Sequence, residues 1–155
     1  MSARREHRIA GVEVRPLTII RDERGAVLHM LRSDAAGFAG FGEIYFSEVA
    51  PRKVKAWRRH SRAITNLAVP HGRIRFVAFD DRHDSDTRGC LVDIEVGDSN
   101  YVLITVAPGI WNGFAALGDE PALVCNCSTL PHDPAEADRL PPDTATIPYE
   151  WSTCT

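Results

Sequence analysis

The sequence predicts an all-β fold, an antiparallel barrel or jelly roll with one short helix near the C-terminus. Short runs rich in Val, Ile, Leu, Phe and Tyr recur between turn signals, which is typical of antiparallel strands. These runs do not alternate with helical segments, so a parallel sheet with crossover helices is disfavoured. Glycines fall at the breaks between runs, where a residue that tolerates positive φ is useful. They are Gly25, Gly72, Gly97 and Gly109.

Nine segments are predicted as strands from their composition and boundaries. In chain order they are Val12–Arg15, Leu17–Arg21, Ala26–Arg32, Glu43–Val49, Asn66–Val69, Arg73–Asp80, Cys90–Val96, Tyr101–Val106 and Ala122–Cys127. One of them shows the expected period of two clearly, because Ile74 and Phe76 alternate with Arg73 and Arg75. A barrel built from such strands offers one mouth and one interior pocket for a ligand.

Two further segments complete the predicted fold. Lys55–His60 is interpreted as a strand, and only Pro134–Leu140 is expected to be helical. With 155 residues, of which 44% are hydrophobic, the chain is expected to form a single domain over residues 1–155. The first ten residues are expected to be flexible.

Charge and composition limit the classes of partner. The net charge of −3 gives no global reason to bind nucleic acid or an anionic membrane, and no apolar run approaches the ~20 residues of a membrane span. We therefore expect a cytoplasmic protein with no nucleic-acid or membrane partner. The four cysteines are expected to be reduced thiols: Cys90, Cys125, Cys127 and Cys154.

Several short motifs carry a family resemblance. They are Asp22-Glu23-Arg24-Gly25, Val54–Arg58, Asp81-Arg82 with Ser85–Gly89, Pro108–Phe114 and Pro148–Trp151. They occur in the same order as in the dTDP-4-dehydrorhamnose 3,5-epimerases of the cupin superfamily, which the chain resembles over nearly its whole length. The resemblance implies a cupin-type jelly-roll barrel and a small-molecule substrate, a nucleotide-linked sugar. It also implies a homodimer in which N-terminal strands pair with the neighbouring subunit, and Arg24 reaches across.

The family reaction implied by the resemblance is proton abstraction beside a ketone, with a base on one face of the sugar and an acid on the other. Three catalytic positions depart from the family pattern here. The base histidine matches Arg58, a second histidine matches Asn112, and the tyrosine acid matches Cys125. A guanidinium stays protonated and an amide does not titrate, so neither Arg58 nor Asn112 can act as a base. A standard 3,5-epimerase is therefore not expected.

Other residues are candidates for the missing chemistry. His60 shares a strand face with Arg58 and is a candidate base, with a hydrogen-bonded histidine at the rim as the alternative. Tyr45 is a candidate proton donor or a packed tyrosine at the mouth. The predicted substrate-binding residues are Arg24, His29, Glu43, Ser47, Lys55, Trp57 and Trp111. For these, surface charge or core packing is the alternative reading.

The sequence predicts neither a metal nor another cofactor. A metal-binding cupin uses His-x-His, a Glu and a later His, whereas here only His60 remains and Asn112 replaces the last ligand. The acidic run Asp80–Asp86 is expected to be a solvated hairpin, because it lacks the Gly and the terminal Glu of a calcium-binding loop.

Three functions remain open from the sequence. The leading hypothesis is a divergent, metal-independent isomerase or epimerase-like enzyme of bacterial secondary metabolism, in natural product biosynthesis, acting on a carbonyl-bearing substrate such as a dTDP-deoxysugar. The second is a cofactor-free cyclase or rearrangement catalyst for a polyketide-like intermediate, in which shape and fixed hydrogen bonds drive the reaction. A deep, apolar pocket favours this second hypothesis, and a shallow, arginine-lined groove counts against it. The third is a non-catalytic nucleotide-sugar-binding protein.

Overall fold

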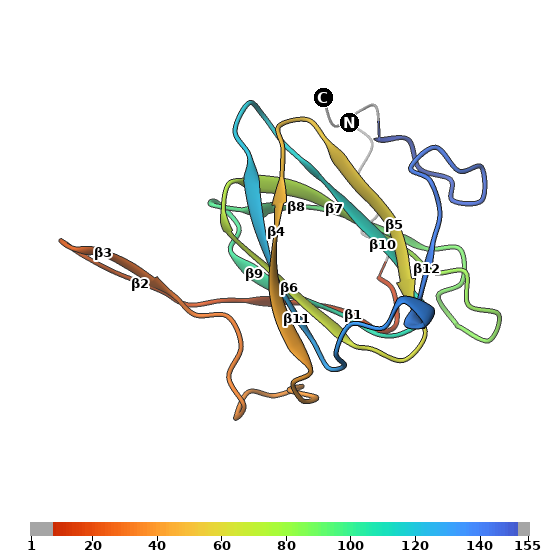
Figure 1. Ribbon diagram of the computed structural model, residues 1–155, viewed down its shortest axis with the longest axis horizontal. Coiled ribbons are helices and arrows are strands. Elements are labelled where there is room, and N and C mark those ends of the chain that lie inside the picture. Colours follow the sequence, from red (N-terminus) through yellow and green to blue (C-terminus); the bar gives the residue numbers. More distant parts are fainter. Residues whose placement is uncertain (1–7, 152–155) are drawn as a thin grey trace.

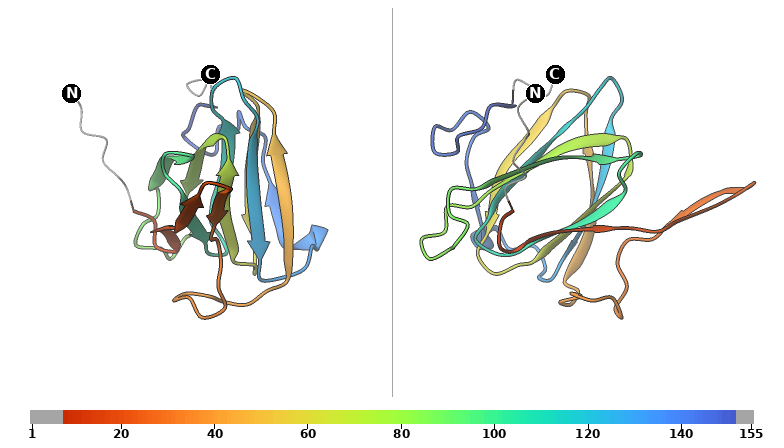
Figure 2. Two further views of the ribbon diagram at one scale, coloured as in Figure 1. Left: turned by 90° about the vertical axis from the view of Figure 1, so that its left-hand side faces the viewer. Right: turned by 180° about the vertical axis from the view of Figure 1, so that it is seen from behind.

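In the computed structural model, which describes residues 8–151, two five-stranded antiparallel sheets face each other and a two-stranded arm projects from them (Figure 1 and Figure 2). The first sheet has the order β1 (Val12–Pro16), β9 (Val102–Val106), β6 (Thr65–His71), β11 (Ala122–Ser128) and β4 (Glu43–Val49). The second has the order β12 (Ala137–Arg139), β5 (Val54–His60), β10 (Trp111–Ala116), β7 (Arg73–Phe79) and β8 (Leu91–Gly97). The arm consists of β2 (Ile19–Asp22) and β3 (Gly25–Leu28).

The all-β, antiparallel prediction is confirmed, with two corrections. Within residues 8–151 the strands form two separate hydrogen-bonded sheets rather than one closed ring, so the fold is a jelly-roll sandwich. The predicted helix over Pro134–Leu140 is wrong. Only Pro134–Glu136 forms a single 3₁₀ turn, η1, in which the Asp133 side chain accepts a hydrogen bond from the backbone N–H of Ala135 at 2.9 Å. The chain then continues as β12, which pairs with β5.

Each of the nine predicted strand segments overlaps a strand of the structure, and the assigned ends differ by a few residues. The largest difference is in Ala26–Arg32, where β3 already ends at Leu28. β10 was not predicted as a strand, although it pairs with both β5 and β7.

The hydrophobic core fills mainly the half of the sandwich around β7, β8 and β9. Ile74, Phe76 and Ala78 are fully buried there, as the alternation of β7 predicts. Ile9 is also buried in this core, so the predicted flexibility of residues 1–10 does not extend to it. Residues 1–7 lie outside the described part of the chain.

A second cluster covers the outer face of the sheet that contains β5. The C-terminal segment folds back over this face, where Trp57 and Trp151 pack with ring centroids 5.1 Å apart and Tyr149 meets Trp57 edge to face. This packing fixes β5 from outside and leaves its inner face free to line a site.

Two glycines allow close approach of the strands. A Cβ at Gly113 would lie 2.4 Å from the Cβ of Ala56, and one at Gly72 would lie 2.6 Å from the carbonyl oxygen of Pro121.

The loop after β7 differs from its prediction as a solvated hairpin. Asp80 is completely buried and accepts hydrogen bonds from the side chains of Arg82, Ser85 and Thr87. The buried carboxylate of Asp80 therefore holds the loop against the sandwich, and the exposed residues lie toward the tip of the loop.

Three cysteines lie in the described part of the chain, Cys90, Cys125 and Cys127, and each is a free thiol. Cys154 lies outside the described residues. None of the helical turns between residues 8 and 151 is long and apolar enough to cross a membrane.

Candidate functional site

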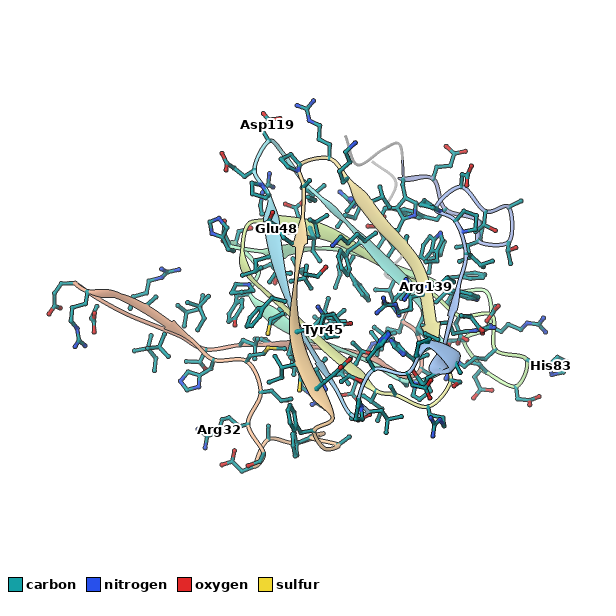
Figure 3. All side chains as sticks on the ribbon, in the orientation of Figure 1. Arg32, Tyr45, Glu48, His83, Asp119 and Arg139 are labelled. Atoms are coloured by element: carbon teal, nitrogen blue, oxygen red, sulfur yellow. The ribbon has the colours of Figure 1, made fainter. Side chains whose placement is uncertain are left out.

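A cavity of about 730 Å³ lies between the two sheets, on the side of β4 and β5. Its volume is within the range of small-molecule sites. Figure 3 shows Tyr45 of β4 and Arg139 of β12 approaching it from different sheets. The lining residues are Tyr45, Ser47, Lys55, Ala56, Trp57, Arg58, His60, Thr65, Leu67, Asn112, Gly113, Phe114, Asn126, Arg139, Leu140 and Pro141.

Strand geometry explains which side chains reach the cavity. On β4, Tyr45 and Ser47 point inward while Ile44 and Phe46 are exposed on the outer face, the alternation expected of a strand. On β5, Lys55 and Arg58 both line the cavity although they are three residues apart. They do so because the pairing with β10 shifts register there, so that one extra residue of β5 is accommodated as a bulge.

His60 forms a hydrogen-bonded pair with a buried carboxylate. Its Nδ1 lies 2.5 Å from Oε2 of Glu136, whose other oxygen accepts hydrogen bonds from the backbone N–H groups of Arg62 and Ala63, each at 2.7 Å. Burial raises the pKa of Glu136, but the hydrogen bonds from His60, Ala63 and Arg62 outweigh it and lower the pKa to about 2. Glu136 is therefore ionised at neutral pH, and Nδ1–H of His60 donates to it. Within residues 8–151 the second ring nitrogen, Nε2, has no hydrogen-bond partner, and His60 lines the cavity.

Two contacts bridge the gap between β4 and β5. Arg58 donates a hydrogen bond from its guanidinium to the Tyr45 hydroxyl at 3.2 Å. Further along, the Lys55 ammonium donates to the Ser47 hydroxyl at 2.8 Å. The first contact places a permanent cation against a phenol oxygen, and this arrangement favours any negative charge that develops on that oxygen.

The cavity is electropositive although the whole chain has a net charge of −3. Lys55, Arg58 and Arg139 line it, and no Asp or Glu is among its lining residues within the described chain. Arg58 and Arg139 are direct neighbours across the pairing of β5 with β12. Clustered guanidinium groups of this kind suit phosphate or carboxylate oxygens, which they bind with two hydrogen bonds each.

The part of the cavity lined by β6, β10 and β11 carries polar side chains that neither gain nor lose a proton near neutral pH. It presents Thr65, Asn112 and Asn126 beside Leu67 and Phe114. Thr65 is only 6% exposed, and its hydroxyl has no hydrogen-bond partner within residues 8–151. A buried hydroxyl left unpaired costs on the order of 1–3 kcal/mol, so a ligand hydroxyl at this point would be favoured.

Most of the predicted site residues are brought together here. The cavity is lined by Tyr45, Ser47, Lys55, Arg58, His60 and Asn112. Trp57 also borders it, but its ring packs against Trp151 in the cluster on the outer face of the sheet. Glu43 lies in a narrow adjoining pocket that also contains Tyr45, Arg58 and His60.

Four predicted site residues lie elsewhere. Cys125 is on the outer face of its sheet, opposite exposed Phe46, so the prediction that it takes the place of the tyrosine acid in this cavity is corrected: its neighbour Asn126 lines the site instead. Arg24 lies on the arm and pairs with Asp22 at 2.6 Å. His29 follows β3 and is outside the cavity lining.

Trp111 is the fourth predicted site residue that lies outside the cavity. It points to the opposite side of its sheet, where its indole N–H donates to Asp81 at 3.0 Å. The Arg59 guanidinium lies 4.4 Å from its ring centroid. This tryptophan therefore serves packing rather than substrate contact.

Sequence reasoning missed Glu136, Arg139, Thr65 and Asn126. Glu136 and Arg139 lie in the segment predicted as helical, far along the chain from His60 and Arg58, and no spacing signal links them. The alternation of β6 and β11 would have placed Thr65 and Asn126 had the inward faces been assigned. Within residues 8–151, no group of three or more His, Cys, Asp or Glu residues is arranged to hold a metal ion.

Comparison with known proteins identifies the family. The model of the family described as dTDP-4-dehydrorhamnose 3,5-epimerase matches residues 6–155. The chain belongs to this family. It is 38% identical over 148 residues to the probable low-salt glycan biosynthesis epimerase of Haloferax volcanii, and the match covers 93% of this chain and 95% of that protein.

Two further proteins are similar to this chain over most of its length. The spore coat polysaccharide biosynthesis protein SpsL of Bacillus subtilis is 30% identical over 147 residues, covering 94% of this chain and 97% of that protein. The crystal structure of a dTDP sugar isomerase from Desulfovibrio desulfuricans superposes with a TM-score of 0.90 at 49% identity, covering 92% of each chain. The match confirms the cupin-type fold expected from the sequence motifs.

Proposed function

We propose that this protein is a nucleotide-sugar isomerase or epimerase that moves a proton beside a carbonyl group, with His60 as the base. A dTDP-linked deoxysugar is the candidate substrate, and neither a metal nor another cofactor is required. The observation that carries the proposal is the His60–Glu136 pair at the cavity, in which an ionised carboxylate holds one ring nitrogen and leaves the other available. A histidine oriented in this way suits proton abstraction near neutral pH.

The geometry supports separate roles for His60, Tyr45 and Arg58 in the proposed reaction. Nε2 of His60 removes the proton from a carbon next to the carbonyl, and Glu136 stabilises the imidazolium that forms. Tyr45 donates its hydroxyl proton toward the carbonyl oxygen as negative charge develops there. Arg58, which donates to the Tyr45 hydroxyl at 3.2 Å, stabilises the charge on that side of the reaction. Arg58 thus acts as a hydrogen-bond donor at the position where the family pattern has a base.

The remaining cavity residues fit the nucleotide-linked part of the substrate. Lys55 and Arg139 supply positive charge for a diphosphate, and the unpaired Thr65 hydroxyl supplies a contact for a sugar hydroxyl. The two curated relatives are named for glycan and spore coat polysaccharide biosynthesis, which favours a role in making a glycan precursor over the predicted role in secondary metabolism. Free thiols in the described chain fit a reducing, cytoplasmic location.

The cyclase alternative is less well supported. A polyketide-like intermediate requires a mainly apolar pocket, whereas Lys55, Arg58 and Arg139 line this cavity. The non-catalytic binding protein shares the same cationic cavity, and only a measurement of proton exchange separates it from the enzyme.

The proposal is tested by incubating the protein with dTDP-4-keto-6-deoxyglucose in D₂O and following ring-proton exchange by NMR. We expect exchange with the wild type and a loss of about 10²–10⁴-fold in the His60→Gln variant. The matched control is His83→Gln, because the side chain of His83 is 86% exposed and lies in the loop after β7. Wild-type exchange no faster than the protein-free rate would exclude the enzyme.

A thermal-shift titration with dTDP completes the experiment. Stabilisation of His60→Gln equal to that of the wild type shows that the variant is folded and that its defect is chemical. Stabilisation of the wild type without any proton exchange would support the binding protein instead. If dTDP does not stabilise the wild type, both nucleotide hypotheses are wrong.

A further inference from the structure

Two asparagines line the cavity from different sheets. Asn112 lies beside Arg58 across the pairing of β10 with β5, and Asn126 lies beside Tyr45 across the pairing of β11 with β4. Arg58 and Tyr45 are joined by a hydrogen bond at 3.2 Å, so these pairings bring the two amides to a similar level of the sandwich. Each amide is one strand further from the sheet edge than the residue it pairs with.

The hydrogen bonds of Asn112 fix the direction of its amide. Its Nδ2 donates to the backbone carbonyl oxygens of Arg58, at 3.4 Å, and of Ile110, at 3.3 Å. A flipped amide would bring Oδ1 against these two oxygens, so that orientation is disfavoured. Both N–H bonds are therefore used within the protein. Oδ1 has no partner within residues 8–151 and is left as a hydrogen-bond acceptor.

Asn126 also carries an amide oxygen without a partner. The residue is only 4% exposed, and its Nδ2 donates to the backbone carbonyl oxygen of Val124 at 3.2 Å. In the described part of the chain nothing donates to its Oδ1. An amide oxygen in so enclosed a position is unfavourable when it stays unpaired, so a ligand group that donates to it gains affinity.

The two amide oxygens favour a neutral donor. A diphosphate ester or a carboxylate offers only acceptor oxygens at neutral pH, so neither can bond to an amide oxygen. A protonated amine can donate, but the guanidinium of Arg58 beside Asn112 disfavours a second positive charge there. A hydroxyl group donates a hydrogen bond and carries no charge. This end of the cavity therefore fits the hydroxyl groups of a sugar.

Resting on the proposed function, we propose that Asn112 and Asn126 are specificity-determining residues that bind two neighbouring hydroxyl groups of the sugar ring. In dTDP-4-keto-6-deoxyglucose these are the 2-hydroxyl and the 3-hydroxyl. The site thus selects sugars that keep both groups and rejects analogues that lack either one. The diphosphate extends the other way, toward Arg139 on the edge strand β12.

Asn112 makes this selection a property of this chain. The family pattern has a histidine at this position, and an imidazole can either donate or accept a hydrogen bond. The amide of Asn112 can only accept, because its N–H bonds are held by the backbone. A substrate that presents an acceptor at this point is therefore disfavoured here.

The test measures the binding of sugars that cannot react. Isothermal titration compares dTDP, dTDP-glucose, dTDP-2-deoxyglucose and dTDP-3-deoxyglucose, none of which has a carbonyl group on the sugar ring. We expect the wild type to bind dTDP-glucose about tenfold or more tightly than either deoxy analogue, because each analogue leaves one amide oxygen without a donor. This comparison needs no variant.

Two variants assign the effect to the asparagines. In Asn112→Ala and in Asn126→Leu the preference over one of the deoxy analogues should fall to about twofold or less. The affinity for dTDP itself should stay at the wild-type value, which shows that the variant is folded. Asn100→Ala is the matched control, since Asn100 is exposed in the turn after β8, and it should keep the full preference.

The possible results separate this inference from the proposed function. Wild-type affinities for the three sugars within about twofold of one another, or an undiminished preference in both variants, would overturn the inference and leave the proposed function intact. The expected preference without proton exchange in D₂O would support the asparagine pair and overturn the proposed reaction. If none of the four compounds binds, both are wrong.

Discussion

Glu136 shows how much of the site depends on single contacts. It lines only the narrow adjoining pocket, yet it fixes His60 through one carboxylate oxygen and the backbone of residues 62 and 63 through the other. Its role is therefore that of a positioning residue, which orients the imidazole and keeps Nδ1 protonated. The same three hydrogen bonds satisfy the carboxylate, which is 6% exposed and would otherwise be costly to bury.

Replacing Glu136 by Gln should disturb catalysis rather than binding. A neutral amide accepts more weakly from Nδ1–H and does not stabilise the imidazolium, so we expect kcat to fall by about 10²-fold with little change in KM. The pH profile of kcat should also move, because the charge beside His60 is gone. Steady-state kinetics between pH 5 and 9 measure both effects, and Glu120→Gln, on the exposed surface, is the matched control. A pH profile identical to that of the wild type would show that Glu136 is only structural.

Arg139 is the cavity cation whose role the sequence did not suggest. It sits beside Arg58 across the strand pairing and has no carboxylate near it among the lining residues. We expect Arg139→Ala to weaken dTDP binding about tenfold or more and to reduce its dependence on salt, because a diphosphate loses one guanidinium partner. Isothermal titration at two salt concentrations measures this. Arg62→Ala is the control, since Arg62 is largely exposed and outside the cavity. Equal affinities for the two variants would remove Arg139 from the binding site.

At the scale of elements, Asp80 fastens the loop between β7 and β8. The carboxylate is wholly buried, and its bond to Arg82 spans 2.9 Å. Burial raises the pKa of Asp80, but the hydrogen bonds from Arg82, Ser85 and Thr87 hold it far below its ordinary value. A carboxyl group with a lowered pKa in the folded state contributes stability above its unfolded pKa, near 3.8, and this contribution is lost as the pH falls below that value.

Asp80→Asn should therefore destabilise the protein at neutral pH by about 2–4 kcal/mol, because Arg82 loses its buried charged partner. The difference from the wild type should shrink as the pH is lowered below about 4, because the Asp80 carboxyl group of the unfolded chain then begins to be protonated while the folded state keeps it ionised. Urea unfolding at pH 7 and pH 3 checks both statements. Asp86→Asn, in the exposed part of the same loop, should change little. A destabilisation that does not depend on pH would exclude the ionic explanation.

Periodicity predicted those strands whose inner face is apolar, and it failed where strand formation depends on distant pairing. β7 shows the alternation itself. β10 contains Asn112 and Gly113, whose low strand propensity hides a strand that is held by β5 and β7 on its two sides. β12 is polar and follows Pro134, so its composition indicates a turn or helix, and only the pairing with β5 makes it a strand.

Strand alternation also predicted part of the candidate site, and contacts between distant segments were again missed. Alternation along β4 and β5 correctly brought Tyr45, Arg58 and His60 to one cavity. Matching by motif placed Cys125 at the acid position, but a one-residue difference in register moves a side chain to the other face of a strand, and Asn126 faces the cavity. Glu136 could not be predicted as the partner of His60, because their contact joins positions 76 residues apart.

At the scale of the whole molecule, apolar surface is exposed on the arm and on the neighbouring edge. The arm extends away from the sandwich (Figure 1), and Ile20 and Val27, paired across it, are 55% and 58% exposed. On the outer face of β4, Ile44 and Phe46 are 54% and 65% exposed. A two-stranded hairpin is marginally stable alone in water, so these surfaces favour burial against another subunit.

We therefore expect a homodimer in solution in which the arm of each subunit packs on the other. Light scattering should give about twice the 17.1 kDa mass of the chain, and the double variant Ile20→Glu with Val27→Glu should give a monomer that keeps its β-sheet circular dichroism. His83→Glu, far from the arm, should remain dimeric. A wild-type mass of a single chain would contradict the dimer.

The dimer also decides whether Arg24 can contribute to substrate binding. Arg24 is 83% exposed by its side chain, lies near the tip of the arm and pairs only with neighbouring Asp22 among the described residues, so it can act only on a cavity other than its own. If the arm reaches the partner, Arg24→Ala should weaken dTDP binding several-fold in the dimeric protein and have no effect in the monomeric double variant. Titrating dTDP into all four combinations measures this coupling as a double-mutant cycle. An equal loss of affinity in both backgrounds would place Arg24 outside any shared site, since a monomer offers no second cavity for it to reach.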